Sequence, residues 1–155
     1  MRVISRANIV AFALPASLMA GALGSQYIGH LYPCEMCWWQ RWPHYAAIAL
    51  AAIAFIAPKG LVQRLLIATA AGGVLTSGMI GAFHAGVEYH WWQGVTPCST
   101  TAAGHSLSDI LSAPLIRCDQ AQWTLFGISL AGFNALISIP GALLIFGLLV
   151  KDRGQ

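Results

Sequence analysis

The side chains of this sequence that could carry redox or metal chemistry are four cysteines. Cys34 and Cys37 form a Cys-Glu-Met-Cys motif, and Cys98 and Cys118 follow much later in the chain. A disulfide within Cys-x-x-Cys closes almost no loop, so such pairs more often exchange electrons or bind metal. For Cys98 and Cys118 two interpretations stay open: a redox pair, or a structural disulfide that stabilises the fold by about 3 kcal/mol.

Zinc is the metal that four thiolates could coordinate. Structural zinc sites usually combine two short cysteine spacings, whereas Cys98 and Cys118 lie far apart in the sequence. The pattern therefore favours electron exchange, and we predict no metal site.

Arg41 is the cation nearest to the Cys-x-x-Cys motif, at position i+4 from Cys37. A fixed cation favours the reactive thiolate. If the chain is already helical there, Arg41 lies one turn from Cys37 and the helix N-terminus adds to the effect. Pro43 could start that helix or kink it. Arg41 could also donate to a carbonyl oxygen of a membrane-dissolved ligand, or simply extend to the membrane interface.

The composition shows which kind of chain must position these residues. Hydrophobic residues make up 57% of the 155 residues and charged residues only 8%, against roughly 25% charged residues in soluble domains. So few charges cannot cover a soluble surface, which argues against a soluble enzyme, a disordered chain and a nucleic-acid-binding protein. We interpret the net charge of +3 as a sign of membrane topology.

Four runs of the sequence carry no charged residue, and each can form a membrane helix. A helix needs about 20 apolar residues to cross a bilayer, and lipid leaves backbone groups no partners outside the helix. We predict an all-α membrane protein, an up-and-down bundle of four transmembrane helices in a single domain, 1–155. Small residues spaced four apart, such as Gly78 and Ala82, or Gly127 and Ala131, predict close helix packing. The predicted spans are 8–28, 42–58, 65–86 and 126–149.

The basic residues predict the orientation of these spans. Six of the eight lie at the N-terminus, in the 58–64 turn or at the C-terminus; only Arg41 and Arg117 lie elsewhere. The positive-inside rule then puts both termini in the cytoplasm. The loops at 29–41 and 87–125 face outward, and all tryptophans and tyrosines lie in or beside them. All four cysteines therefore face an oxidising compartment, the periplasm or cell exterior.

Two segments allow a further interpretation. Residues 1–24 resemble a signal peptide, but the long charge-free stretch and the spans that follow favour an uncleaved first helix. Residues 106–116 place several apolar side chains so that they could share one face. We predict a short helix on the membrane surface there, bounded or broken by Pro97 and Pro114.

Three segments of the sequence resemble the family of disulfide-bond formation protein B, DsbB. The first is its first-loop signature, and the second resembles the end of its third helix. The third resembles the entry into its fourth helix. The resemblance covers nearly the whole chain, including the number and orientation of the spans. The segments are Tyr32-Pro33-Cys34-Glu35-Met36-Cys37-Trp38-Trp39-Gln40-Arg41-Trp42-Pro43; Phe83-His84-Ala85-Gly86-Val87-Glu88; and Arg117-Cys118-Asp119 with Gln122, Trp123, Phe126, Gly127 and Ser129.

The resemblance implies a role for each cysteine in a quinone-dependent thiol oxidase of the bacterial inner membrane. Cys98 and Cys118 would oxidise a periplasmic thioredoxin-fold partner of the DsbA type, with Cys98 forming the mixed disulfide. Cys34 and Cys37 would reoxidise that pair through a transient Cys34–Cys118 bridge. Cys37 would pass the electrons to a membrane quinone, with ubiquinone favoured over menaquinone.

Two further residues are implied as quinone-binding. Arg41 would hold the quinone, and His84 matches a family position near its ring. Without the resemblance, His84 reads as an ordinary interfacial histidine. The chain departs from the family in a shorter Cys98–Cys118 spacing and in Gln40, where some members carry Glu.

Two other functions fit parts of the pattern. One is a quinone-linked reductase of the vitamin K epoxide reductase type, whose Cys-x-x-Cys normally lies inside a helix near the end of its bundle. The other is a non-catalytic membrane scaffold with structural disulfides or a metal site.

Overall fold

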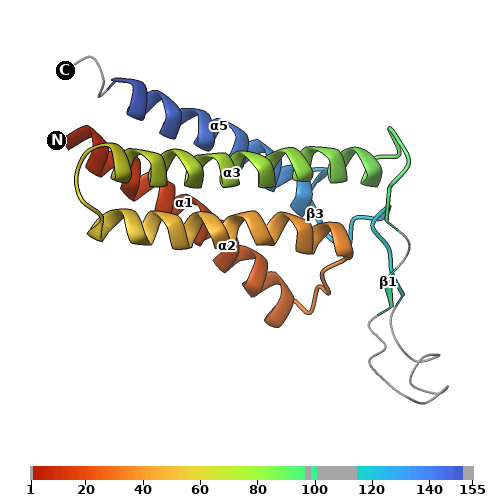
Figure 1. Cartoon of the computed structure of the whole chain (residues 1–155). Coiled ribbons are helices and arrows are strands. Elements are labelled where there is room, and N and C mark those ends of the chain that lie inside the picture. The colour runs from red at the N-terminus through yellow and green to blue at the C-terminus, as the bar shows by residue number, and fades with distance from the viewer. Residues whose placement is uncertain (1, 97–98, 101–114, 152–155) are drawn as a thin grey trace.

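The computed structural model describes residues 2–96, 99–100 and 115–151. Within them the chain forms four long helices and two pairs of very short strands (Figure 1). This confirms the prediction of an all-α protein. The helices are α1 (Arg2–Tyr27), α2 (Glu35–Ile56), α3 (Leu61–Glu88) and α5 (Leu130–Lys151); the strands are β1 (Ser99–Thr100), β2 (Leu115–Ile116), β3 (Thr124–Leu125) and β4 (Ile128–Ser129).

The four helices run up and down beside one another. Helix α3 packs along both α2 and α5, and α1 packs against α2 and α5. The start of α1 and the end of α5 lie at one end of the bundle, and β1 lies at the opposite end (Figure 1). The starts of α2 and α5 and the end of α3 therefore share the end of the bundle that is far from the termini.

Three of these helices are long and apolar enough to cross a membrane: Arg6–Tyr27, Leu61–Glu88 and Leu130–Lys151. Helix α2 differs because its first half carries Gln40, Arg41 and His44, all of which are buried in the bundle. Polar groups inside a membrane bundle face its interior and mark functional sites.

Small side chains form much of the contact between the helices. A Cβ added at Gly78 of α3 would lie 2.9 Å from Ile139 Cγ1 and 3.1 Å from the backbone nitrogen of Ile139, and one added at Gly81 would lie 2.9 Å from the carbonyl oxygen of Ala131. Only glycine allows the backbones to approach this closely. The apolar core between the helices consists largely of alanine: Ala7, Ala11, Ala47, Ala51, Ala54, Ile67, Ala70, Ala71, Val74, Ala142, Ile145 and Leu149.

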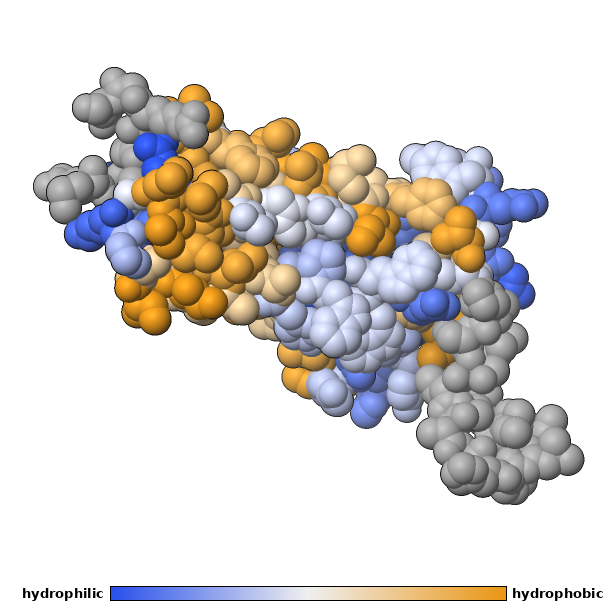
Figure 2. All heavy atoms as spheres, viewed as in Figure 1, coloured by the Kyte–Doolittle hydropathy of each residue, from blue (hydrophilic) through white to orange (hydrophobic). Residues whose placement is uncertain are grey.

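Large apolar side chains cover part of the outer surface. On the face drawn in Figure 2 they gather over the half of the bundle that holds the termini. A soluble protein rarely exposes so many large apolar side chains together, whereas lipid contact accounts for them. Examples are Phe55, Ile56, Leu61, Leu65, Leu143, Leu144 and Val150.

All four helices start at residues other than the predicted span starts, and for α2 and α5 the difference has a local cause. Helix α2 begins at Glu35, not at residue 42, so Pro43 lies inside it and 35–41 is helix rather than loop. Charge-free runs locate apolar stretches, and a capped helix can continue past them. Helix α5 begins at Leu130, not at 126, because β3 and β4 pair across Phe126 and Gly127, whose φ angles are 52° and 77°. Gly127 therefore lies in a turn and does not share a helix face with Ala131.

The predicted surface helix at 106–116 falls mostly outside the described residues, as do Pro97 and Pro114. Its last two residues, Leu115 and Ile116, are in strand β2, paired antiparallel with Thr100 and Ser99 of β1. The end of this prediction is wrong, because extended residues paired between strands are not helical.

Candidate functional site

Cys34 caps the N-terminus of α2 and thereby sets the position of Cys37. Cys34 has extended backbone angles, φ −74° and ψ 175°, and its Sγ accepts a hydrogen bond from the backbone N–H of Cys37 at 3.3 Å. The Sγ atoms of the two cysteines lie 3.0 Å apart, with Cys34 as the donor, and both cysteines are free thiols. Cys37 is thus in the first turn of a helix, where unpaired backbone N–H groups favour a thiolate.

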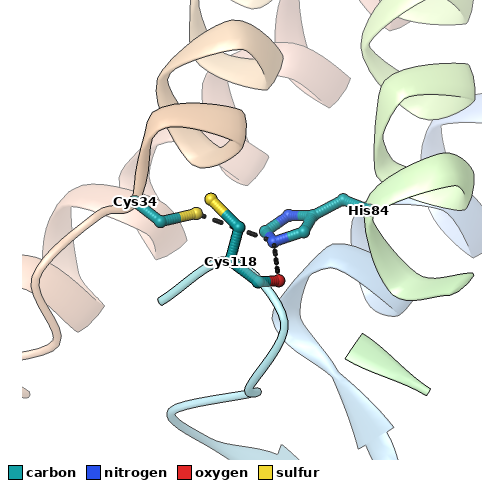
Figure 3. Close-up of side chains that lie close together, drawn as sticks. All are labelled: Cys34, His84 and Cys118. Carbon is teal, nitrogen blue, oxygen red and sulfur yellow. Dashed lines mark hydrogen bonds between the residues drawn. The ribbon is translucent and has the colours of Figure 1, made fainter. Parts of the chain in front are cut away.

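Cys118 reaches the same point from the chain segment before α5. The Sγ of Cys34, the Nε2 of His84 and the Sγ of Cys118 all lie within 4.8 Å of one another. Figure 3 shows the three side chains converging from the start of α2, from α3 and from the 118 segment. All three are buried, and Met36, Val87 and Ile116 pack around the sulfurs. Two of the predicted redox cysteines, distant in sequence, are therefore neighbours inside the protein.

His84 joins these segments. Its Nε2 lies 3.1 Å from the carbonyl oxygen of Cys118 and 3.6 Å from the Sγ of Cys34 (Figure 3). Its Nδ1 lies 2.9 Å from the Nε2 of Gln40, an amide that also donates to the carbonyl of Met36. Because Gln40 is the donor, Nδ1 accepts, and in the neutral ring Nε2 carries the hydrogen that it donates to Cys118. His84 is thus a buried residue of the cysteine cluster and not an interfacial side chain.

The three thiols differ in acidity because their sulfur atoms share hydrogen bonds and are buried to different degrees. The hydrogen bond from Cys34 lowers the pKa of Cys118 to about 5, against the opposing effect of burial. The same kind of hydrogen bond from Cys34 lowers the pKa of Cys37. Donation to Cys118 and Cys37, together with burial, raises the pKa of Cys34. In the reduced protein, Cys118 and Cys37 therefore form the thiolate more readily than Cys34 does.

Arg41 lies one helical turn after Cys37 and is only 6% exposed. Its guanidinium donates to the Oε1 of Gln26 and, at 3.1 Å, to the carbonyl of Ala22, both in α1. The guanidinium carbon also lies 5.1 Å from the centre of the Trp38 ring, a cation–π contact. Arg41 is therefore held against α1 inside the bundle, rather than extended to the membrane interface.

A cavity of about 210 Å³ lies among α1, α2 and α5, beside these residues. Most of its wall is apolar, with Leu18, Met19 and Phe133 among the lining residues, and Cys37, Arg41 and His44 also line it. The Nδ1 of His44 is buried without a hydrogen-bond partner among the described residues. An apolar pocket with a few polar groups fits a lipid-soluble ring that carries oxygen atoms.

Comparisons with known proteins show the family of the chain. The family described as "Disulfide bond formation protein DsbB" matches residues 5–148. The chain belongs to the DsbB family. A protein named "Disulfide bond formation protein B" from Azoarcus is 30% identical over 161 residues, covering 94% of this chain and 92% of that protein. One with the same name from Marinobacter nauticus is 26% identical over 159 residues, covering 92% and 88%.

An uncharacterised protein of Rickettsia prowazekii is also similar, with 27% identity over 146 residues that cover 90% of this chain and 83% of that protein. No solved structure shows significant similarity to the chain. Membership of the DsbB family confirms the resemblance noted in the sequence. It makes the chain a membrane oxidoreductase with a role in disulfide-bond formation.

Cys98, the remaining cysteine of the DsbB-family pattern, lies outside the described residues. The residue after it, Ser99, is paired with Ile116, two residues before Cys118. Strands β1 and β2 therefore bring the residue that follows Cys98 close to the segment that carries Cys118.

The sequence did not identify a polar network that continues from the DsbB-family site into the bundle. It links Gln40 to Asn134, whose Nδ2 donates to Gln40 Oε1 at 2.8 Å, and Asn134 to His44 at 3.0 Å. One signal was available: His44 and Asn134 are polar residues inside predicted membrane spans, where such residues are costly and usually functional.

Proposed function

We propose that the protein is a quinone-dependent thiol oxidase, which reoxidises a periplasmic DsbA-like thioredoxin-fold protein and passes the electrons to a membrane quinone. One observation carries the proposal. Cys34 lies between Cys118 on one side and Cys37 on the other, and Cys37 lines an apolar cavity together with Arg41. This is the order in which a disulfide must move between a soluble partner and a lipid-soluble carrier.

The first half of the relay is thiol–disulfide exchange with the partner. A thiolate of the partner attacks Cys98 of the Cys98–Cys118 disulfide, forming a mixed disulfide and releasing Cys118 as thiolate. The second thiol of the partner then attacks the mixed disulfide. The partner leaves oxidised, and Cys98 and Cys118 have gained two electrons.

The second half returns the disulfide to that pair. The Cys118 thiolate attacks Cys34 of the Cys34–Cys37 disulfide, so a Cys34–Cys118 bridge forms and Cys37 leaves as thiolate. Cys98 then attacks Cys118, which restores the Cys98–Cys118 disulfide and leaves Cys34 reduced. Cys118 makes this attack as the thiolate released from the Cys98–Cys118 disulfide, and the hydrogen bond from His84 to its backbone carbonyl keeps it beside Cys34.

The last step takes place at the cavity. A quinone, when bound, accepts two electrons and two protons and leaves as the quinol. The chain contributes a Cys37 thiolate in the first turn of α2, the fixed charge of Arg41 and an apolar wall that excludes water. Ubiquinone is the preferred carrier in this proposal.

The same proposal includes the topology. The chain is a single domain of four transmembrane helices in the bacterial inner membrane, with both termini cytoplasmic and the cysteine-bearing segments periplasmic. Its support is the placement of basic residues in the sequence and the position of the cysteine cluster at the end of the bundle far from the termini. Helix α2 crosses the membrane with its polar side chains turned into the bundle.

Purified protein tests this function directly. With a reduced DsbA-like protein as electron donor, it is expected to reduce a short-chain ubiquinone, with one quinone consumed per disulfide formed in the partner. The Cys37→Ser variant is the matched control and should not turn over. Stoichiometric zinc in the purified protein, without quinone reduction, would instead support a metal site at Cys34, His84 and Cys118, whose ligand atoms are close enough to share an ion.

A further inference from the structure

His44 and Asn134 form a polar pair at the wall of the cavity. The Nε2 of His44, in α2, lies 3.0 Å from the Oδ1 of Asn134, in α5. Both residues line the same cavity as Cys37 and Arg41. His44 is 3% exposed, so its hydrogen bonds must come from the protein or from a molecule in the cavity.

The neighbours of Asn134 determine which way its amide faces. Its Nδ2 donates to Gln40 Oε1 at 2.8 Å, and to the hydroxyl and carbonyl oxygens of Ser77 at 3.1 Å and 3.2 Å. The Oδ1 accepts from the hydroxyl of Ser138 at 2.7 Å. Backbone carbonyls fix the donors of this network, because Gln40 donates to Met36 and Ser77 donates to the carbonyl of Gln40. The oxygen of Asn134 therefore faces His44.

This orientation determines the tautomer of His44. An amide oxygen can only accept, so the Nε2 of His44 must carry the hydrogen that it donates to Asn134. The Nδ1 of the neutral ring then has a lone pair and no hydrogen. It is a buried acceptor without a partner among the described residues, and such a group is costly unless a ligand supplies a donor.

We propose that the Nδ1 of His44 accepts a hydrogen bond from a hydroxyl group of the quinol, so that the cavity binds the reduced carrier more tightly than the oxidised one. This inference rests on the proposed function. The oxygens of a quinone are acceptors only, whereas reduction by two electrons and two protons converts them into hydroxyl donors. Arg41, a donor, can serve an oxygen in either state, but the Nδ1 acceptor of His44 can serve only the reduced state.

The preference has a consequence for the direction of electron flow. A site that binds quinol more tightly than quinone raises the reduction potential of the bound carrier, by about 30 mV for each tenfold difference in affinity. His44 would then favour removal of electrons from Cys37. It acts as a positioning and selectivity residue, and no electron passes through it.

The test measures binding separately for the two redox states. In a Cys37→Ser background, which cannot exchange electrons with the carrier, dissociation constants are measured for decylubiquinone and for decylubiquinol without oxygen. The protein with native His44 is expected to bind decylubiquinol more tightly than decylubiquinone. His44→Leu should weaken quinol binding by about 2- to 10-fold, the value of one net hydrogen bond, and leave quinone binding unchanged.

Two further variants separate hydrogen bonding from packing. His44→Gln can donate to Asn134 through its amide nitrogen and offer its oxygen to the cavity, so it should keep the preference for quinol. Thr76→Val is the matched control, because the Thr76 hydroxyl is exposed on α3 and donates only within its helix, to Gly72. It should change neither constant.

A second measurement needs no change at His44. Side-chain nitrogen NMR of the histidines should show an unprotonated Nδ1 at His44, whose resonance shifts when decylubiquinol is added but not when decylubiquinone is added. The inference about His44 would be overturned if His44→Leu weakened the binding of quinone and quinol equally. It would also be overturned if the Nδ1 of His44 were protonated and its resonance shifted with neither decylubiquinol nor decylubiquinone. Neither result would contradict the proposed function. If the protein with native His44 binds neither form, the proposed function fails as well.

Discussion

The Nε2 of His84 lies 3.1 Å from the carbonyl oxygen of Cys118, and this hydrogen bond ties the segment before α5 to helix α3 beside Cys34. The backbone of Cys118, and not its sulfur, is the group that His84 holds. The sulfur is therefore kept near Cys34 while it stays free to react. Gln40 orients the histidine from its other nitrogen, so the contact depends on α2 as well.

Loss of His84 should therefore slow the bridge between the two cysteine pairs. In a variant whose cysteines are only Cys34 and Cys118, oxidation should form the Cys34–Cys118 disulfide rapidly. His84→Leu should slow this by about 2- to 10-fold, the effect of one net hydrogen bond. The rate is measured by alkylating the remaining thiols at intervals. An unchanged rate would mean that the strand pairing of β1 with β2 positions Cys118 by itself.

The acidity of Cys118 gives a prediction for pH dependence. Its pKa is lowered from 9.0 to about 5, chiefly by the hydrogen bond from Cys34. Between these two values the folded protein holds a thiolate where an ordinary thiol is protonated, and this thiolate is lost as the pH falls through about 5. In the reduced variant whose cysteines are only Cys34 and Cys118, the ultraviolet absorbance of the thiolate should titrate with a midpoint near pH 5. Cys34→Ala should move the midpoint upward, whereas a midpoint near 9.0 in both variants would contradict the assignment.

How far the sequence predicted this site depended on the range of each contact. The turn from Cys37 to Arg41 is local, and the motif spacing indicated it on the condition that the chain is helical there. The cap at Cys34 was not predicted, because residues 29–41 were expected to form a loop. The approach of Cys118 to Cys34 depends on the folding of the segment before α5, and only the family resemblance suggested it. The pairing of His44 with Asn134 depends on how two helices are rotated about their axes, which apolar runs do not specify.

The proposed topology predicts which side of the membrane the cysteines face. Six of the eight basic residues lie in the parts of the chain assigned to the cytoplasm. After reduction, the thiols at 34, 37, 98 and 118 should be reached by a membrane-impermeant reagent from outside the inner membrane, with buried Cys34 slower than half-buried Cys37. A cysteine placed at Lys59, in the turn between α2 and α3, is the matched control and should react only after that membrane is opened. The reverse pattern would contradict the orientation.

The order of the relay can be tested by removing a resolving thiol. In Cys118→Ala, the Cys98 thiol has no partner within its pair, so it can attack the disulfide of the oxidised DsbA-like protein and release one partner thiol. The resulting mixed disulfide should accumulate, because no Cys118 thiol can displace the partner. Non-reducing electrophoresis detects this species, and a further Cys98→Ser change should abolish it. A mixed disulfide that persists after Cys98→Ser and is lost with Cys34→Ser would show that the partner enters through Cys34.

Loss of Arg41 should weaken quinone binding and slow quinone reduction without changing the oxidation of the partner protein. The guanidinium is buried beside Cys37 and at the cavity wall, where it already donates to Ala22 and Gln26. A hydrogen bond to a charged group is worth about 1.5–3 kcal/mol, so Arg41→Ala should weaken apparent quinone affinity by roughly 10- to 150-fold. Arg41→Lys should recover part of this, because it keeps the charge but loses the planar fork.

Two measurements separate these roles of Arg41: the steady-state KM for quinone, and the single-turnover rate at which the oxidised protein oxidises its partner without quinone. Arg41→Ala should raise the first and leave the second nearly unchanged, since Cys98 and Cys118 meet the partner before the carrier is needed. Arg64→Ala is the matched control, because Arg64 donates to the carbonyl of Leu149 at the far end of the bundle. If Arg41→Ala kept a normal KM and a normal rate of quinone reduction, Arg41 would serve only to pack α2 against α1.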